Sequence, residues 1–166
     1  MNKKAIILWL ITFIWMIVIF IFSANDGASS VSKSKKITYE VINIVEKKKS
    51  EKEKKEKVEI VHPSVRKVAH AFEYAVLYIL VIFSLKTSNI KVNKIYLIAL
   101  VICILYATTD EIHQLFVSGR SGELKDVIID TAGATIGLII FNLTHRLLYR
   151  KKNKSWINST FKNNIN

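Results

Sequence analysis

Ionisable side chains that suit anion binding or proton transfer stand at the ends of the apolar segments of this chain. Arg66, His70 and Glu73 are spaced by four and then three residues, so on a helix they share one face. Glu73 would lie about 10 Å along the helix axis from Arg66 at 1.5 Å per residue. At that depth in a membrane a charge is costly unless it is paired or hydrated. Arginine suits bidentate binding of phosphate or carboxylate, whereas histidine and glutamate can move protons.

A second set of candidates follows in residues 110–130. It comprises Asp110, Glu111, His113, Gln114, Arg120, Asp126 and Asp130. Asp126, Asp130, Gly133 and Gly137 are spaced by four, three and four residues, so two carboxylates share a helix face with a GxxxG pattern. Glycines at this spacing allow close approach of another helix, which would hold both carboxylates against it.

Four apolar segments position these residues: 5–22, 68–85, 95–109 and 127–148. Each is predicted to cross a bilayer core of about 30 Å. The first favours an uncleaved anchor over a signal peptide, because its apolar run exceeds a usual signal core and no cleavage site follows it. We therefore predict an all-α integral membrane bundle of four transmembrane helices in residues 1–150, followed by a basic polar tail at 151–166.

The connections are strongly charged. Residues 23–65 are predicted as a long charged loop, and their middle, 46–57, alternates lysine and glutamate. That alternation indicates either a solvated helix with i,i+4 pairs or a disordered segment. A second polar loop is predicted at 110–126, where the sequence SGRSG signals a turn.

Four spans place both termini and the 86–94 connection on one side of the membrane. All charged residues on that side are basic, whereas all 13 Asp and Glu lie on the other side. The positive-inside rule predicts a multi-pass membrane protein with cytoplasmic termini, and the richness in lysine, isoleucine and asparagine favours a bacterial cell membrane. Whichever the orientation, the second span begins where the third ends and the fourth begins, so both sets of candidate residues should lie near one face.

The net charge of +12 does not indicate a nucleic-acid partner, because many of the basic residues flank the spans, where membrane lipids account for them.

The single cysteine, Cys103, cannot form an internal disulfide and is predicted to pack in the apolar core. Lys67 and Tyr74, one heptad apart, are predicted on a stripe beside that of Arg66.

Several roles for the cluster remain open on the residues alone. It could bind a lipid-linked or phosphate-bearing envelope molecule, with Arg66, Lys67 and Arg120 as anion ligands and His70, Glu73 and His113 as catalytic candidates if chemistry occurs. It could be a purely structural ion-pair network in a protein that acts by helix contacts. A metal site, built from the i,i+3 pairs His70–Glu73 and Asp110–His113, is opposed by the nearby arginine. Ion or proton transport would require an oligomer, and no cofactor is assigned.

The chain resembles the VanZ family of small bacterial membrane proteins, named for an accessory protein of teicoplanin resistance. The resemblance rests on three segments: FSAN (22–25), where the family more often has Gln at the last position, RKVAHAFEY (66–74), and DEIHQLFVSGR with DVIIDTAGATIG (110–137). The Lys/Glu-rich segment 46–57 looks atypical for the family. The resemblance implies a membrane protein connected with the cell envelope or with glycopeptide susceptibility, and it implies no established reaction. It adds the glycopeptide itself to the candidate ligands.

Overall fold

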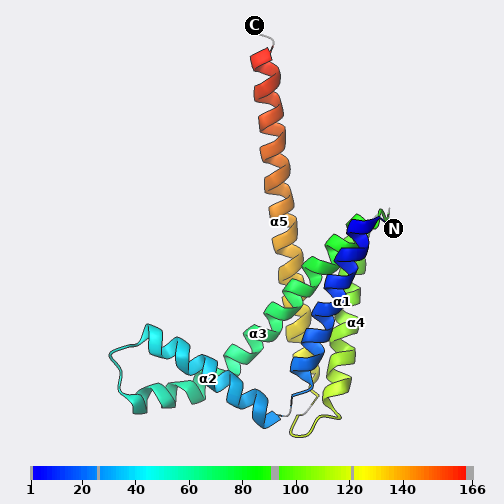
Figure 1. The fold of residues 1–166 in the computed structure, drawn as a ribbon. Helices are drawn as coiled ribbons and strands as arrows, with labels where there is room; N and C mark the ends of the chain where they lie inside the picture. The colour runs from blue at the N-terminus through cyan, green and yellow to red at the C-terminus, as the bar shows by residue number, and fades with distance from the viewer. Residues whose placement is uncertain (1, 26, 91–93, 121, 164–166) are drawn as a thin grey trace.

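The computed structural model describes residues 2–25, 27–90, 94–120 and 122–163, with side chains for all of these except 149 and 151–163. Five helices follow one another: α1 (Lys3–Ser23), α2 (Gly27–Val45), α3 (Glu51–Thr87), α4 (Ile95–Gln114) and α5 (Leu124–Asn163) (Figure 1). No strand occurs in the described residues. The all-α prediction is therefore confirmed.

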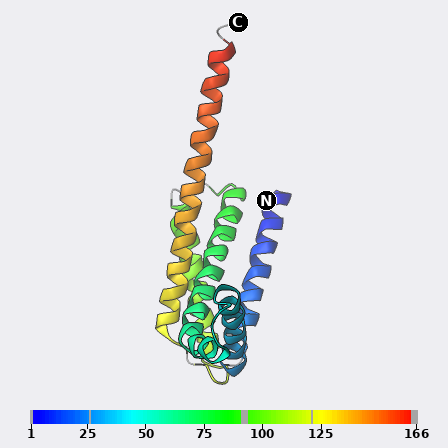
Figure 2. The same cartoon turned by 90° about the vertical axis from the view of Figure 1, so that its left-hand side faces the viewer.

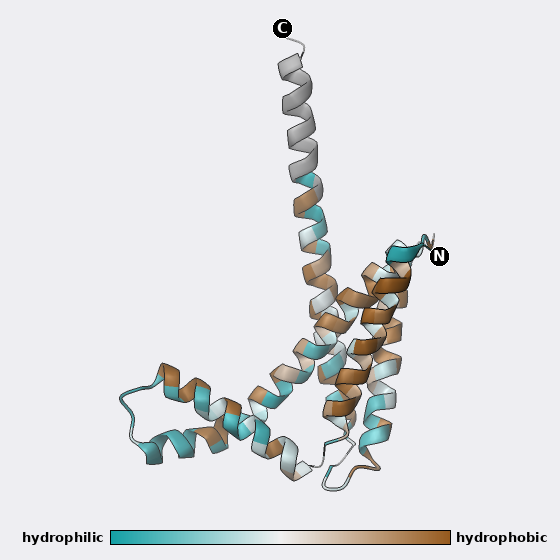
Figure 3. Cartoon of the chain, viewed as in Figure 1, coloured by the Kyte–Doolittle hydropathy of each residue, from teal (hydrophilic) through white to brown (hydrophobic). Residues whose placement is uncertain are grey.

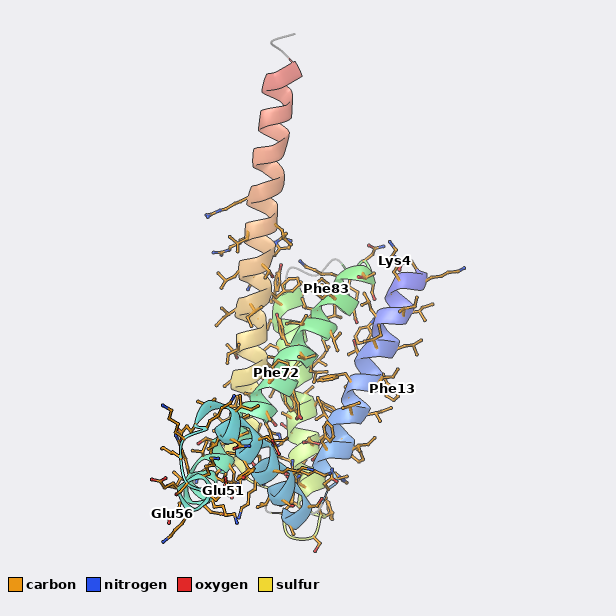
Figure 4. The ribbon with its side chains drawn as sticks, turned by 60° about the vertical axis from the view of Figure 1, so that its left-hand side comes forward. Lys4, Phe13, Glu51, Glu56, Phe72 and Phe83 are labelled. Atoms are coloured by element: carbon orange, nitrogen blue, oxygen red, sulfur yellow. The ribbon has the colours of Figure 1, made fainter. Side chains whose placement is uncertain are left out.

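Four of these helices are long and apolar enough to cross a membrane: α1, α3, α4 and the Leu124–Leu148 part of α5. This confirms the prediction of four apolar helices of spanning length, and Figure 3 colours α1 as predominantly hydrophobic. Lys4 lies at the opposite end of the bundle from Glu51 and Glu56, as Figure 4 shows. The purely basic end of the bundle and the end that contains acidic residues are thus separated in space, as the charge pattern predicted.

The predicted long loop at 23–65 is wrong, because most of it is helical. Helix α2 and the first part of α3 form a hairpin at the end of the bundle remote from the N-terminus, where Figures 1 and 2 agree in placing it. A capping box starts α3: the Ser50 side chain accepts from the Glu53 backbone N–H, and the Glu53 carboxylate accepts from the Ser50 N–H. The helix continues through Pro63 into the membrane span.

The hairpin is closed by polar and apolar contacts between its two helices. Lys35 pairs with Glu59 at 2.7 Å, and Lys57 pairs with Glu46. The buried face of α2 carries Ser34, Thr38 and Ile42, and that of α3 carries Lys54 and Val58. For residues 51–57, the helical alternative is confirmed and the disordered one is wrong. The Lys35–Glu59 pair joins α2 to α3 and the Lys57–Glu46 pair joins α3 to the loop after α2, so neither follows the predicted i,i+4 pattern.

Helix α3 is the centre of the bundle and packs against each of the other four helices. Its face from Tyr74 to Leu85 is buried against small residues of α4, among them Ala99, Cys103 and Ala107. Cys103 is 1% exposed, so its predicted packing role is confirmed.

Helices α3 and α5 approach closely at the GxxxG pattern, as predicted. A Cβ added at Gly133 would overlap the backbone of Ala71, and one at Gly137 would lie 2.6 Å from the carbonyl oxygen of Ala75. Only a residue without a side chain allows this contact. The approach holds the carboxylate-bearing start of α5 against α3.

Two boundaries differ from the prediction. Helix α4 continues to Gln114, so the predicted loop at 110–126 is wrong at its start, and its four polar candidates at 110–114 belong to the last helical turn. The turn is helical because Asp110 and Gln114 are hydrogen-bonded to each other on its buried side. Helix α5 runs past the expected end at 148 to Asn163, so the backbone of the tail is helical up to that residue.

Candidate functional site

The three segments that carry the family resemblance meet at the hairpin end of the bundle. The end of α1, the middle of α3, the end of α4 and the start of α5 converge there, joined by the 115–123 connection. Gly27, at the start of α2, donates from its N–H to the Ser118 carbonyl at 3.2 Å. A Cβ at Gly27 would overlap Gly119, whose φ of +71° itself favours glycine. These contacts fix the connection against the hairpin.

Arg120 is bound mainly by backbone groups of α1. Its Nε donates to the Asn25 carbonyl at 3.0 Å and its Nη2 to the Phe22 carbonyl at 3.2 Å. A cation at the carboxyl end of a helix satisfies unpaired carbonyls and the helix dipole together. Burial lowers the pKa of the Arg120 guanidinium from its ordinary value, and the nearby charge of Arg66 acts in the same direction. Arginine nevertheless stays protonated in proteins.

Arg120 also extends a chain of hydrogen bonds into the bundle. Its Nη1 donates to Gln114 Oε1 at 3.0 Å, and Gln114 Nε2 donates to Asp110 Oδ2 at 3.2 Å. Gln114 and Asp110 are both 2% exposed. The adjacent Glu111 carboxylate accepts from the Glu123 N–H at 2.9 Å, which ties the end of α4 to the start of α5. The three polar residues of this helical turn therefore hold the ends of helices together.

A second buried group lies deeper, between α3 and α5. The Nδ1 atom of His70 is 3.9 Å from both Glu73 Oε2 and Asp130 Oδ1, too far for a hydrogen bond. His70 Nδ1, Asp130 Oδ1 and the hydroxyl of Tyr74 are buried without a hydrogen-bond partner among the described residues. Asp130 is 1% exposed and Tyr74 is fully buried. Asp130 therefore lies against the face of α3 that bears His70, as its spacing from Gly133 and Gly137 predicted.

A cavity of about 310 Å³ opens at the membrane face above this group. It lies between the hairpin and the start of α5. Its ionisable lining comprises His62, Arg66, Lys67, His70, Arg120, Glu123 and Asp126. Three permanent cations therefore face one cavity from two separate segments of the chain.

A second cavity, of about 210 Å³, lies among α1, α2 and α3. Arg66, His70 and Arg120 border both cavities and so form the wall between them. Glu73 lines only the second cavity, beside the apolar Phe22 and Ile37. Two of the three predicted anion ligands, Arg66 and Arg120, and the predicted proton carrier His70 are thus brought together at this wall.

His113 lies apart from the other two catalytic candidates. Its ring stacks on Phe20 of α1 with centroids 4.3 Å apart. No described contact joins it to His70 or Glu73. Among the residues with described side chains, no three His, Cys, Asp or Glu form an arrangement that could hold a metal ion.

Sequence reasoning missed two residues of the site. His62 lines the larger cavity and lies 3.4 Å from Ser34 of α2 through its Nδ1 atom. His62 lies four residues before Arg66, which on a helix places both on one face. This signal was not used, because residues 23–65 were predicted to form a loop. Asn25 joins the site through its carbonyl, and its side-chain amide donates to carbonyls of the last turn of α1.

Comparison with known proteins gives a family. The family model described as VanZ/LLP1 matches residues 8–145, from α1 into α5, and that range contains every candidate residue. Searches of curated proteins and of solved structures each returned no match. The chain belongs to the VanZ/LLP1 family.

Proposed function

We propose that this VanZ-like membrane protein binds an anionic group of an envelope molecule in the 310 Å³ cavity, and thereby contributes to envelope homeostasis and to protection against teicoplanin. The observation that carries the proposal is the state of Arg66. Its side chain is half-buried, lines the cavity, and has no hydrogen bond or ion pair with another described residue. A partly desolvated cation without a partner is unfavourable, and a bound anion would neutralise it.

The other lining groups narrow the ligand chemistry. Lys67 adds a second, exposed cation, and the guanidinium fork of Arg66 matches phosphate or carboxylate oxygens. Glu123 and Asp126 line the same cavity. A ligand that fits both charges carries hydroxyl or amine donors beside its anion, as sugar-bearing and amine-bearing envelope molecules do.

A purely structural role for all the charges fits part of the site. It accounts for Arg120, whose Nε and both terminal nitrogens donate to α1 and α4. It leaves Arg66 unexplained. Binding is favoured over catalysis because His113 stacks on Phe20 and lines neither cavity, whereas His70 and Glu73 both line the second cavity.

The phenotype is tested in a teicoplanin-sensitive Gram-positive host that expresses wild type, Arg66→Gln or Lys125→Gln. Lys125 is an exposed residue outside both cavities and serves as the matched control. With membrane levels equalised by blotting, wild type and Lys125→Gln should raise the inhibitory concentration and Arg66→Gln should not. Equal protection by all three variants would refute a working anion site.

A further inference from the structure

Helix α2 carries a largely exposed apolar stripe, whose first residue, Ile37, also lines the 210 Å³ cavity. Ile37, Val41, Ile44 and Val45 are 54–74% exposed. Their spacing places them on one side of the helix, next to the stripe of Ser34, Thr38 and Ile42 that packs on α3. Helix α2 therefore has a buried face of Ser34, Thr38 and Ile42 against α3, and beside it a second, apolar face that is largely exposed.

The remaining sector of α2 and the loop that follows are basic. Residues 27–50 contain six lysines (33, 35, 36, 47, 48 and 49) and two glutamates (40 and 46). Lys36, Lys47 and Lys48 form no ion pair within the described part of the chain, whereas Lys35 and Lys49 are paired. An apolar stripe beside unpaired lysines is the pattern of a helix that lies in the headgroup region of an anionic bilayer.

The short connection between α1 and α2 places the start of α2 at the depth expected of the lipid headgroups. Helix α1 leaves the membrane at Ser23 and α2 begins at Gly27, so α2 starts at the membrane surface. Both views of the ribbon show the hairpin beside the lower part of the spans rather than extending away from their ends (Figures 1 and 2). Figure 3 colours residues at the far end of α2, near the hairpin tip, as hydrophobic.

We propose that α2 is an interfacial helix whose stripe of Ile37, Val41, Ile44 and Val45 lies in the lipid headgroup and acyl boundary, with the adjacent lysines on anionic headgroups. The occupant of this surface is the lipid bilayer of the protein's own membrane. None of these four residues lines the 310 Å³ cavity, and the assignment of this surface does not depend on a ligand there. It also explains why a hairpin so rich in lysine exposes four large aliphatic side chains on one side.

The test uses spin labels on a Cys103→Ala background, which removes the single native cysteine. Val41→Cys places the label on the stripe, and Lys36→Cys places the matched control on the exposed basic face of the same helix. The protein is reconstituted in nanodiscs containing phosphatidylglycerol. Accessibility to oxygen, which partitions into lipid, is compared with accessibility to a water-soluble nickel chelate.

The proposal predicts a severalfold higher oxygen-to-nickel accessibility ratio at position 41 than at position 36. Equal, water-like ratios at both positions would overturn it. Low accessibility to both reagents at position 41 would also overturn it, because a protein surface or a second copy of the chain would then cover the stripe.

Discussion

At the scale of single residues, the two central arginines have different roles despite lining the same cavity. Arg120 donates three hydrogen bonds, two of them to carbonyls at the end of α1, whereas Arg66 has no partner among the described residues. The sequence placed both beside the same carboxylates, but it could not separate their roles. The partners of Arg120 are mostly backbone atoms, which no pattern of side chains reveals.

Arg120→Ala should lower the free energy of unfolding by about 2–4 kcal/mol, because it removes three charge-assisted hydrogen bonds that join the 115–123 connection to the end of α1 and to α4. Thermal unfolding in detergent measures this change. Lys125→Ala, at an exposed position of α5, should leave the midpoint unchanged. An Arg120→Ala protein as stable as wild type would show that these bonds do not hold α1 to the connection.

Residue spacing was informative where both partners lie on long helices. The i,i+4,i+7 pattern of Arg66, His70 and Glu73 predicted a shared face, and all three line the second cavity. Asp126 and Asp130 share a face of α5, as their i,i+4 spacing predicted. Asp126 lines the 310 Å³ cavity, and Asp130 lies beside His70. His113 departed from its predicted neighbours because its position on α4 directs it toward α1.

At the scale of elements, the contact between α3 and α5 sets the geometry of the buried polar group. Gly133 and Gly137 meet the backbone at Ala71 and Ala75, so the spacing of these helices has no flexible side chain to adjust. This contact was predictable, since GxxxG is a local pattern with a known packing consequence.

Gly133→Ala should destabilise the protein by about 1–3 kcal/mol through overpacking against backbone atoms that cannot move aside. Ala132→Val, at the adjacent exposed position, is the matched control and should be close to neutral. Thermal unfolding of both variants measures the difference. If Gly133→Ala were as stable as Ala132→Val, the close approach of α3 and α5 would be in error.

The hairpin was the element that sequence reasoning missed. A high density of charge suggested a loop, although Ser50 and Glu53 form a capping box that can be read directly from the sequence. The lysines and glutamates that follow are themselves good helix formers. Their pairing across the two helices, as between Lys35 and Glu59, depends on tertiary structure and was not accessible from local spacing.

At the scale of the whole molecule, four spans and the separation of charge were predictable because both follow from long apolar runs and their flanks. The position of the site followed from topology alone. Successive spans cross in opposite directions, so the start of the second, the end of the third and the start of the fourth lie at the same face. The cavities were not predictable, because they depend on how α2 lies against the bundle.

Cytoplasmic termini remain the prediction of the positive-inside rule. On the Cys103→Ala background, Ser118→Cys should react with a membrane-impermeant maleimide on intact cells, and Lys4→Cys should react only after permeabilisation. Lys4 lies at the start of α1 (Figure 4), whereas Ser118 accepts a hydrogen bond from Gly27 beyond the other end of that helix, so the two positions lie at opposite ends of the bundle. The reverse labelling pattern would invert the orientation but leave the four spans intact.

The most direct test of the anion site is binding by the purified protein, measured by native mass spectrometry with phosphatidylglycerol and with phosphatidylcholine as the uncharged-headgroup comparison. We expect wild type and Lys125→Gln to retain phosphatidylglycerol preferentially, and Arg66→Gln to lose that preference while keeping its thermal stability. Equal retention of phosphatidylglycerol by wild type and Arg66→Gln would contradict the account, because the unpartnered guanidinium would then contribute nothing to anion binding.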